Sequence, residues 1–80
     1  MNKLIIRKDL QSRHYTYDSA ELVIARETMG LSQREFAELC GWSQSYQSNL
    51  ECPEGIRISK HVAFMLRYIL QDTIQVIIVS

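Results

Sequence analysis

The chain has 80 residues and holds nine lysine or arginine and nine aspartate or glutamate side chains, so its formal net charge is zero. This length corresponds to a single small domain. No segment approaches the roughly 18 apolar residues of a membrane span, and no long apolar stretch with a cleavage site follows the N-terminus, so we expect a cytoplasmic protein without a membrane segment.

Residues 3–7, KLIIR, are the first predicted element. They are short, apolar at their centre and rich in branched side chains, which is typical of a β-strand. The basic and aromatic residues 13–17 follow. We interpret them as a connector whose tyrosines cover the core, with a basic arm toward an anionic partner as the alternative.

A helix is predicted between Asp18 and Gly30. Asp18 is a suitable N-cap, and Glu21 follows it at the spacing of a capping box. Gly30 marks the end of the helix. The inner face is expected to consist of Leu22, Ala25 and Met29.

Residues 31–51, LSQREFAELCGWSQSYQSNLE, predict two short helices joined by a glycine turn. Ser32 and Glu35 have the spacing of a capping box, so the first helix should begin at Gln33. It should end at Gly41, which can adopt the left-handed conformation of a helix C-cap. Its buried face is expected to consist of Phe36, Ala37 and Cys40.

The second of these helices is polar along its length. Ser43 is its predicted N-cap, and no ionised side chain occurs from Gln44 until Glu51. Amides and hydroxyls of this kind read base edges in the DNA major groove, where Gln or Asn can bond adenine through two hydrogen bonds. The plain alternative is an ordinary solvated helix surface, on which such side chains are common.

Pro53 is placed to end the polar helix, and Gly55 permits a turn with positive φ. Ser59 then caps a helix predicted to run from Lys60 to about Gln71. Its apolar face consists of Val62, Met65, Leu66, Ile69 and Leu70.

Residues 73–79, TIQVIIV, are uncharged and mostly β-branched, which predicts a C-terminal strand. An apolar strand with a free edge is prone to pair with another strand. The expected partners are the strand of residues 3–7 in the same chain, the same strand of a second subunit, or both.

Over roughly residues 18–70 the chain resembles the lambda-repressor-like family of helix-turn-helix proteins, the XRE-type phage Cro and repressor proteins. The resemblance rests on Glu21-Leu22 with Ala25-Arg26, Gly30-Leu31-Ser32-Gln33, Phe36-Ala37, Gly41 and the run from Ser43 to Glu51. It implies a fold that is mainly α with short β. A four-helix core at residues 18–71 would be flanked by an N-terminal strand and arm at residues 1–17 and by a C-terminal strand at residues 73–79.

The resemblance also implies a sequence-specific DNA-binding transcriptional regulator, in particular a Cro-like repressor in a bacterial cytoplasm. Its implied partners are double-stranded DNA with a palindromic operator and a second copy of the chain, joined through the C-terminal strand. Gln44, Ser45 and Asn49 would face bases. Arg26 and Glu51 would form a partly buried ion pair. The residues expected at DNA are Gln33, Arg34, Ser43, Gln44, Ser45, Tyr46, Ser48, Asn49, Arg57 and Lys60.

Two positions depart from the family pattern, which usually has an apolar residue in place of Gln47 and an aliphatic one in place of Trp42. If Gln47 faces the core, its amide needs a partner, because an unsatisfied buried polar group costs about 1–3 kcal/mol. Alternatively the helix is rotated, and Trp42, Tyr46 and Leu50 form its inner stripe. Tyr46 would then be a core residue and not a DNA contact.

The charge is unevenly distributed along the chain. Residues 1–17 hold four cationic side chains and one acidic, a net +3; residues 18–55 hold two and seven, a net −5; residues 56–80 hold three and one, a net +2. Attraction to DNA phosphates must therefore come from Arg34, Arg57 and Lys60, with the N-terminal segment as a further source. We expect a shallow salt dependence of DNA binding.

The acidic segment motivates an alternative function, that of a protein-binding helix-turn-helix module such as an antitoxin or an antagonist of another regulator. Leu39 and Trp42 are candidate exposed contacts, and the C-terminal strand could extend a partner's sheet. The chain has no glycine-rich phosphate loop and no nucleophile with an ordered base, so we expect neither an enzyme nor a cofactor.

The cysteines predict neither a disulfide nor a metal site. Cys40 and Cys52 are too far apart for a CxxC pair, and their spacing to His14 and His61 matches no usual zinc pattern. We expect Cys40 to be a small core residue and Cys52 a thiol just past a helix end.

Overall fold

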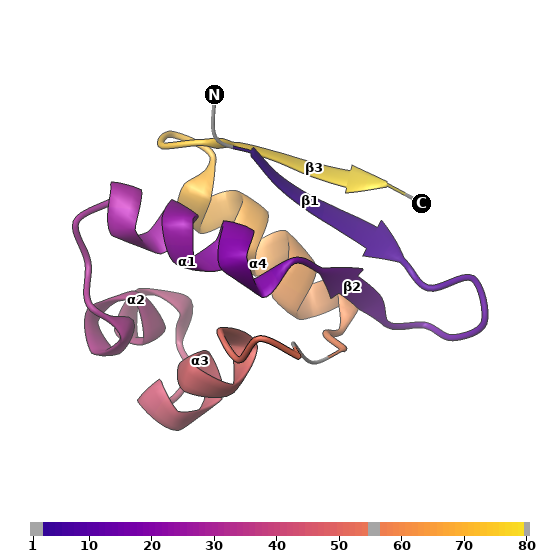
Figure 1. Ribbon diagram of the computed structural model, residues 1–80, viewed down its shortest axis with the longest axis horizontal. Helices are drawn as coiled ribbons and strands as arrows, with labels where there is room; N and C mark the ends of the chain where they lie inside the picture. The colour runs from indigo at the N-terminus through magenta and orange to yellow at the C-terminus, as the bar shows by residue number, and fades with distance from the viewer. Residues whose placement is uncertain (1–2, 55–56, 80) are drawn as a thin grey trace.

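The computed structural model describes residues 3–54 and 57–79, and within them it has four α-helices and a three-stranded β-sheet (Figure 1). In chain order the elements are β1 (Lys3–Lys8), β2 (Tyr15–Tyr17), α1 (Ser19–Thr28), α2 (Gln33–Cys40), α3 (Gln44–Leu50), α4 (Lys60–Leu70) and β3 (Gln75–Val79). The four helices lie where they were predicted. The sheet has one strand more than predicted, so the fold is mixed α/β. None of the described helices is long and apolar enough to cross a membrane.

β1 is the central strand of the sheet, in the order β2-β1-β3. It runs antiparallel to β2, with Ile6 opposite Tyr17, and parallel to β3, with Ile5 opposite Ile77. The two terminal strands therefore pair within the chain, which is one of the partners expected for the C-terminal strand. Parallel neighbours need a long crossover connection, and here it contains the helices.

β2 corrects the prediction for residues 13–17, which were expected to form a connector or an arm. The loop before it turns the chain back, with the Asp9 N–H donating to the His14 carbonyl oxygen at 2.9 Å. Tyr15 then exchanges two backbone hydrogen bonds with Ile58, at 2.7 and 3.0 Å. The Tyr15 side chain is buried, as the connector interpretation expected, but its backbone belongs to the sheet.

One face of the sheet packs on helices (Figure 1). Leu4 and Ile6 of β1 are fully buried, and Val76 and Ile78 of β3 pack against the same core, as the alternation of side chains along a strand requires. α1 contacts β1 and α4 contacts β3. α2 and α3 lie on the side of these helices away from the sheet, so the polar helix sits at the far end of the molecule (Figure 1).

The predicted caps of α2, α3 and α4 are confirmed. The Ser32 hydroxyl accepts from the Glu35 N–H at 3.1 Å, and the Glu35 carboxylate accepts from the Ser32 N–H at 3.0 Å. Gly41 has a φ of 85°, and this left-handed conformation ends α2. Ser43 caps α3, and Ser59 caps α4.

α1 has the predicted N-cap, Asp18, but not the predicted capping box. The Asp18 carboxylate accepts from the Ala20 N–H at 2.9 Å, but Glu21 does not complete a capping box with it. Instead the Glu21 carboxylate accepts from the backbone N–H of Ile5 at 3.2 Å. Glu21 thus ties the start of α1 to the sheet by satisfying a donor of β1.

The remaining predictions on the core and the turns have mixed outcomes. Cys40 is buried, and burial raises the pKa of its thiol to about 12, whereas Cys52 is exposed. α4 ends at Leu70 and β3 begins at Gln75, so both predicted ranges were slightly too long. The predicted turn at Gly55 lies outside the described residues.

Candidate functional site

α3 is half buried along its length, with one face in the core and the other in solvent. Gln47 and Leu50 are fully buried, and Tyr46 packs partly against the core. The exposed face carries side chains at the i, i+1, i+4 and i+5 spacing of one side of a helix. These side chains are Gln44, Ser45, Ser48 and Asn49.

A shallow hollow of about 360 Å³ lies over this exposed face. It is lined by four residues of α3 and one of α2, namely Gln44, Ser45, Ser48, Asn49 and Gln33. None of them is ionisable, and all five are among the residues predicted to contact DNA. The hollow therefore presents neutral hydrogen-bond donors and acceptors from two helices.

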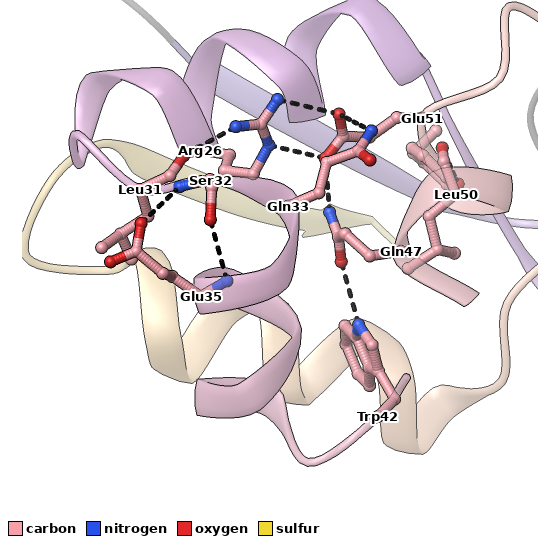
Figure 2. A network of polar contacts seen from close by, with 10 residues as sticks. Arg26, Leu31, Ser32, Gln33, Glu35, Trp42, Gln47, Leu50 and Glu51 are labelled. Carbon is pink, nitrogen blue, oxygen red and sulfur yellow. Dashed lines mark hydrogen bonds and ion pairs between the residues drawn. The ribbon is translucent and has the colours of Figure 1, made fainter. Parts of the chain in front are cut away.

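Behind the hollow lies the ion pair that the family resemblance implied (Figure 2). The Arg26 Nε donates to Glu51 Oε2 at 2.7 Å, and its Nη2 donates to Oε1 at 3.0 Å, a bidentate geometry. Nη1 donates to the Leu31 carbonyl oxygen at 2.6 Å. The two side chains are only 11% and 5% exposed. This pair joins α1 to the end of α3.

Gln47, where the family resemblance implied an apolar residue, is buried, and both its amide nitrogen and its amide oxygen have a hydrogen-bond partner. Its Nε2 donates to Glu51 Oε2 at 2.7 Å, and its Oε1 accepts from the Trp42 Nε1 at 2.9 Å (Figure 2). Among residues 3–54 and 57–79, no buried side-chain nitrogen or oxygen lacks a hydrogen-bond partner. Trp42 and Gln47, the two residues that depart from the family pattern, are therefore the donor and the acceptor of one hydrogen bond.

Tyr46 contributes to packing and does not line the hollow. Its ring meets that of Trp42 edge to face, with the centroids 5.4 Å apart, and burial raises the pKa of its phenol. Gln47 is fully buried, and Trp42 and Tyr46 are partly buried and pack against the core with Leu50, so the structure combines the buried Gln47 with part of the alternative inner stripe.

Gln33 belongs to both the hollow and the network. Its Nε2 donates to Glu51 Oε1 at 3.1 Å, so a side chain predicted to contact DNA is also held by a carboxylate. Burial alone would raise the pKa of Glu51, but the hydrogen bonds from Arg26, Gln47 and Gln33, with the charge of Arg26, hold it below its ordinary value. Glu51 is thus ionised and compensated at neutral pH.

The three cations predicted to contact DNA lie outside the hollow, and each has a partner within the chain. Arg34 pairs with Glu38 at 3.5 Å, and Arg57 pairs with Asp9 at 3.7 Å. The ammonium group of Lys60 lies 5.7 Å from the centroid of the Phe64 ring. Ser43, also predicted at DNA, uses its hydroxyl to cap α3.

A second hollow, of about 320 Å³, lies where β1, β2 and the start of α1 meet. It is lined by Arg7 and Glu21 among others, but the Glu21 carboxylate is occupied by the Ile5 N–H. No group of three His, Cys, Asp or Glu side chains that could hold a metal ion occurs within the described part of the chain.

Comparison with protein-family models, with curated proteins and with solved structures found no match for this chain. The site is therefore interpreted from its own geometry. Sequence reasoning identified the residues of the hollow, but it missed that Trp42 and Gln47 are partners. The sequence did contain a signal for this contact. Both residues that depart from the family pattern carry a hydrogen-bonding group, and they lie five positions apart where the chain turns into α3.

Proposed function

We propose that the chain is a sequence-specific DNA-binding regulator of the lambda-repressor-like helix-turn-helix type, acting as a Cro-like repressor on a palindromic operator. One observation carries this proposal. Five neutral donor and acceptor side chains gather in one exposed hollow, four of them on α3, whose opposite face is anchored in the core, and one on α2. Helix-turn-helix proteins read the major groove with a helix presented in this way.

In this proposal α3 is the recognition helix and α2 the helix that crosses the DNA backbone. Gln44 and Ser45, in the first turn of α3, read base edges, and Asn49 reaches the same groove one turn later. Ser48 and Gln33, the other two residues that line the hollow, bond phosphate or sugar oxygens. Tyr46 supports α3 from behind.

Affinity for phosphates comes from Arg34, Arg57 and Lys60. Arg34 and Arg57 are mostly exposed members of ion pairs worth about 0–1 kcal/mol, and Lys60 is held by a ring contact alone, so phosphates can replace these partners at little cost. Each neutralised phosphate adds about 0.9 to the slope of log K against log salt concentration. We expect a slope of about 3 in magnitude for each protomer.

Dimerisation through β3 is part of the proposal. On one side of the sheet, the outer edge of β2 is covered where Tyr15 pairs with Ile58, whereas β3 forms the other edge of the described sheet. β3 carries no charge and no proline, the usual protections of an edge. Antiparallel pairing with β3 of a second copy would close this edge, and a palindromic operator then requires the two recognition helices to lie about 34 Å apart.

The test is selection of bound sequences from a randomised duplex pool at low salt. A palindromic consensus is expected. Gln44→Ala and Ser45→Ala should change the preferred bases, whereas Arg57→Ala should weaken all duplexes alike. Leu10→Ala, at a residue that is 94% exposed in the loop before β2, is a control that should change neither. Failure of the protein to enrich any sequence would refute the proposal.

A protein-binding module is the second candidate, and the exposure of Leu39 favours it. This side chain is 55% exposed on α2, beside the acidic Glu35 and Glu38. Such a surface suits a basic protein partner better than a phosphate backbone. If no duplex is enriched, affinity capture with Leu39→Asp as the negative control tests this candidate.

A further inference from the structure

The hydrogen bonds behind the hollow form a continuous chain from the turn between α2 and α3 to the hollow itself (Figure 2). Trp42 donates to Gln47, Gln47 donates to Glu51, and Gln33 donates to the same carboxylate. Of these residues, only Gln33 lines the hollow. We propose that Trp42 and Gln47 are positioning residues, which set the orientation of the Gln33 amide in the hollow through the carboxylate of Glu51.

The first step of this argument concerns the orientation of the Gln47 amide. An indole N–H can donate a hydrogen bond but cannot accept one, so the group that faces Trp42 must be the amide oxygen. The Gln47 NH₂ then faces the Glu51 carboxylate, as the distance of 2.7 Å between Nε2 and Oε2 shows. A flipped amide would place N–H against N–H at one end and oxygen against carboxylate at the other. Trp42 thereby selects one orientation.

The second step concerns the carboxylate, whose acceptor sites are fully used. Oε2 accepts from Arg26 Nε and Gln47 Nε2, both at 2.7 Å, and Oε1 accepts from Arg26 Nη2 at 3.0 Å and Gln33 Nε2 at 3.1 Å. A carboxylate offers about four lone-pair sites, and each here has a donor. Loss of the Gln47 donor would leave Oε2 unbalanced and allow the carboxylate to rotate, which would move the site that holds Gln33.

The third step is the consequence at the hollow. With one N–H of Gln33 held by Glu51, its amide plane is restrained, and its carbonyl oxygen and second N–H remain for a ligand. A group restrained before binding loses less conformational freedom when a ligand binds. Trp42 and Gln47 therefore restrain Gln33, on α2, before a ligand binds. As far as the ligand is DNA, this inference rests on the proposed function.

The variants that test this inference separate an effect on the orientation of Gln33 from an effect on folding stability. Trp42→Phe keeps the ring against Tyr46 but removes the indole N–H, which leaves the Gln47 oxygen without a donor. The double variant Trp42→Phe/Gln47→Leu removes the unpaired amide oxygen together with the Gln47 donor to Glu51, so it breaks the network without leaving a buried amide oxygen unpaired. Val62→Ala, at a buried residue of α4 outside the network, supplies a loss of stability without a change in the network.

The first readout needs no ligand. In ¹⁵N-labelled free protein, the side-chain amide signals of Gln33 should shift in Trp42→Phe and remain shifted in the double variant, although Gln33 and Trp42 make no direct hydrogen bond. They should keep their positions in Val62→Ala. Unchanged Gln33 signals in both network variants would overturn the inference. If no duplex is ever enriched, the proposed function fails, but this readout still decides the inference.

The second readout is affinity for the selected duplex, measured where every variant is folded. Trp42→Phe and the double variant should each bind about tenfold more weakly, and Val62→Ala should stay within about twofold of the wild type. A merely structural role predicts that both network variants, where they are folded, bind within about twofold of the wild type, as Val62→Ala does. That result would overturn the inference.

Discussion

The Arg26 side chain supports a sharp test of the network, because its removal leaves a buried charge behind. Arg26→Met keeps much of the side-chain volume but removes the donors to both Glu51 oxygens and to the Leu31 carbonyl oxygen. Gln33 and Gln47 still donate to the carboxylate, but neutral donors do not cancel its charge. We therefore expect the cost of an uncompensated buried carboxylate and not merely that of lost hydrogen bonds.

The expected loss is large compared with the stability of the domain. Removal of one partner of a buried ion pair costs about 3–5 kcal/mol. At roughly 0.05–0.15 kcal/mol per residue, a chain of this length has a total stability of about 4–12 kcal/mol. Since 1 kcal/mol changes the Tm of such a domain by about 4–8 °C, the Tm of Arg26→Met should fall by about 12 °C or more.

Thermal and urea unfolding at neutral pH, followed by circular dichroism, would measure this loss. Arg34→Met is the matched control, because the Arg34 and Glu38 side chains are 77% and 69% exposed and lie 3.5 Å apart. Its cost should be about 0.5 kcal/mol. The deficit of Arg26→Met should shrink in acid, as protonation removes the buried charge of Glu51. Equal losses in the two variants would refute the reasoning.

Three further predictions follow from single groups. The pKa of Glu51 in the folded state lies below its ordinary value of 4.5, so the folded state binds this proton less readily than the unfolded state. The contribution of the Glu51 carboxylate to stability is therefore present above about pH 4.5 and is lost as the pH falls. Urea midpoints should decline from about pH 6 to about pH 3, and Glu51→Gln should flatten this decline. A thiol reagent should label Cys52 but not Cys40 in the native protein, because Cys40 is buried and its pKa is raised to about 12; two labels without denaturant would contradict this. Ile77→Lys should convert a dimer to a monomer in sedimentation, because it places like charges opposite each other on the proposed β3 interface. Leu10→Lys should leave the dimer intact. A dimer that survives Ile77→Lys would exclude pairing through β3.

The parts of the fold that depend on neighbours in sequence could be predicted, and those that depend on distant neighbours could not. Ser32, Ser43 and Ser59 act as caps through bonds to N–H groups three residues away, so their pattern is local. β2 has three residues, too few to show alternation, and it exists because β1 and Ile58 flank it. Glu21 has the spacing of a capping box but serves a strand donor that no local rule could identify.

The same distinction applies to the candidate site. The exposed face of α3 follows from helical spacing once its buried face is known, so Gln44, Ser45 and Asn49 could be identified early. The partners of Arg34, Arg57 and Lys60 within the chain differ in whether the sequence could identify them. Arg34 pairs within its own helix turn, a local spacing, but the partner of Arg57 is Asp9 in a loop far away in sequence. Trp42 and Gln47 could be recognised as departures, but their contact depends on how the chain enters α3 through the Ser43 cap and on the side-chain conformations of both residues.

In the proposed function, base selection and affinity reside in different parts of the molecule. The hollow contains no ionisable side chain, and Glu51, which holds Gln33, is paired with Arg26 at 2.7 Å, so the carboxylate that contacts the hollow's Gln33 is compensated. The cations lie outside the hollow in weak partnerships that phosphates can replace. A substitution in the hollow should therefore change which bases are read at nearly constant salt dependence, whereas loss of a cation should lower the salt slope without changing the preferred sequence.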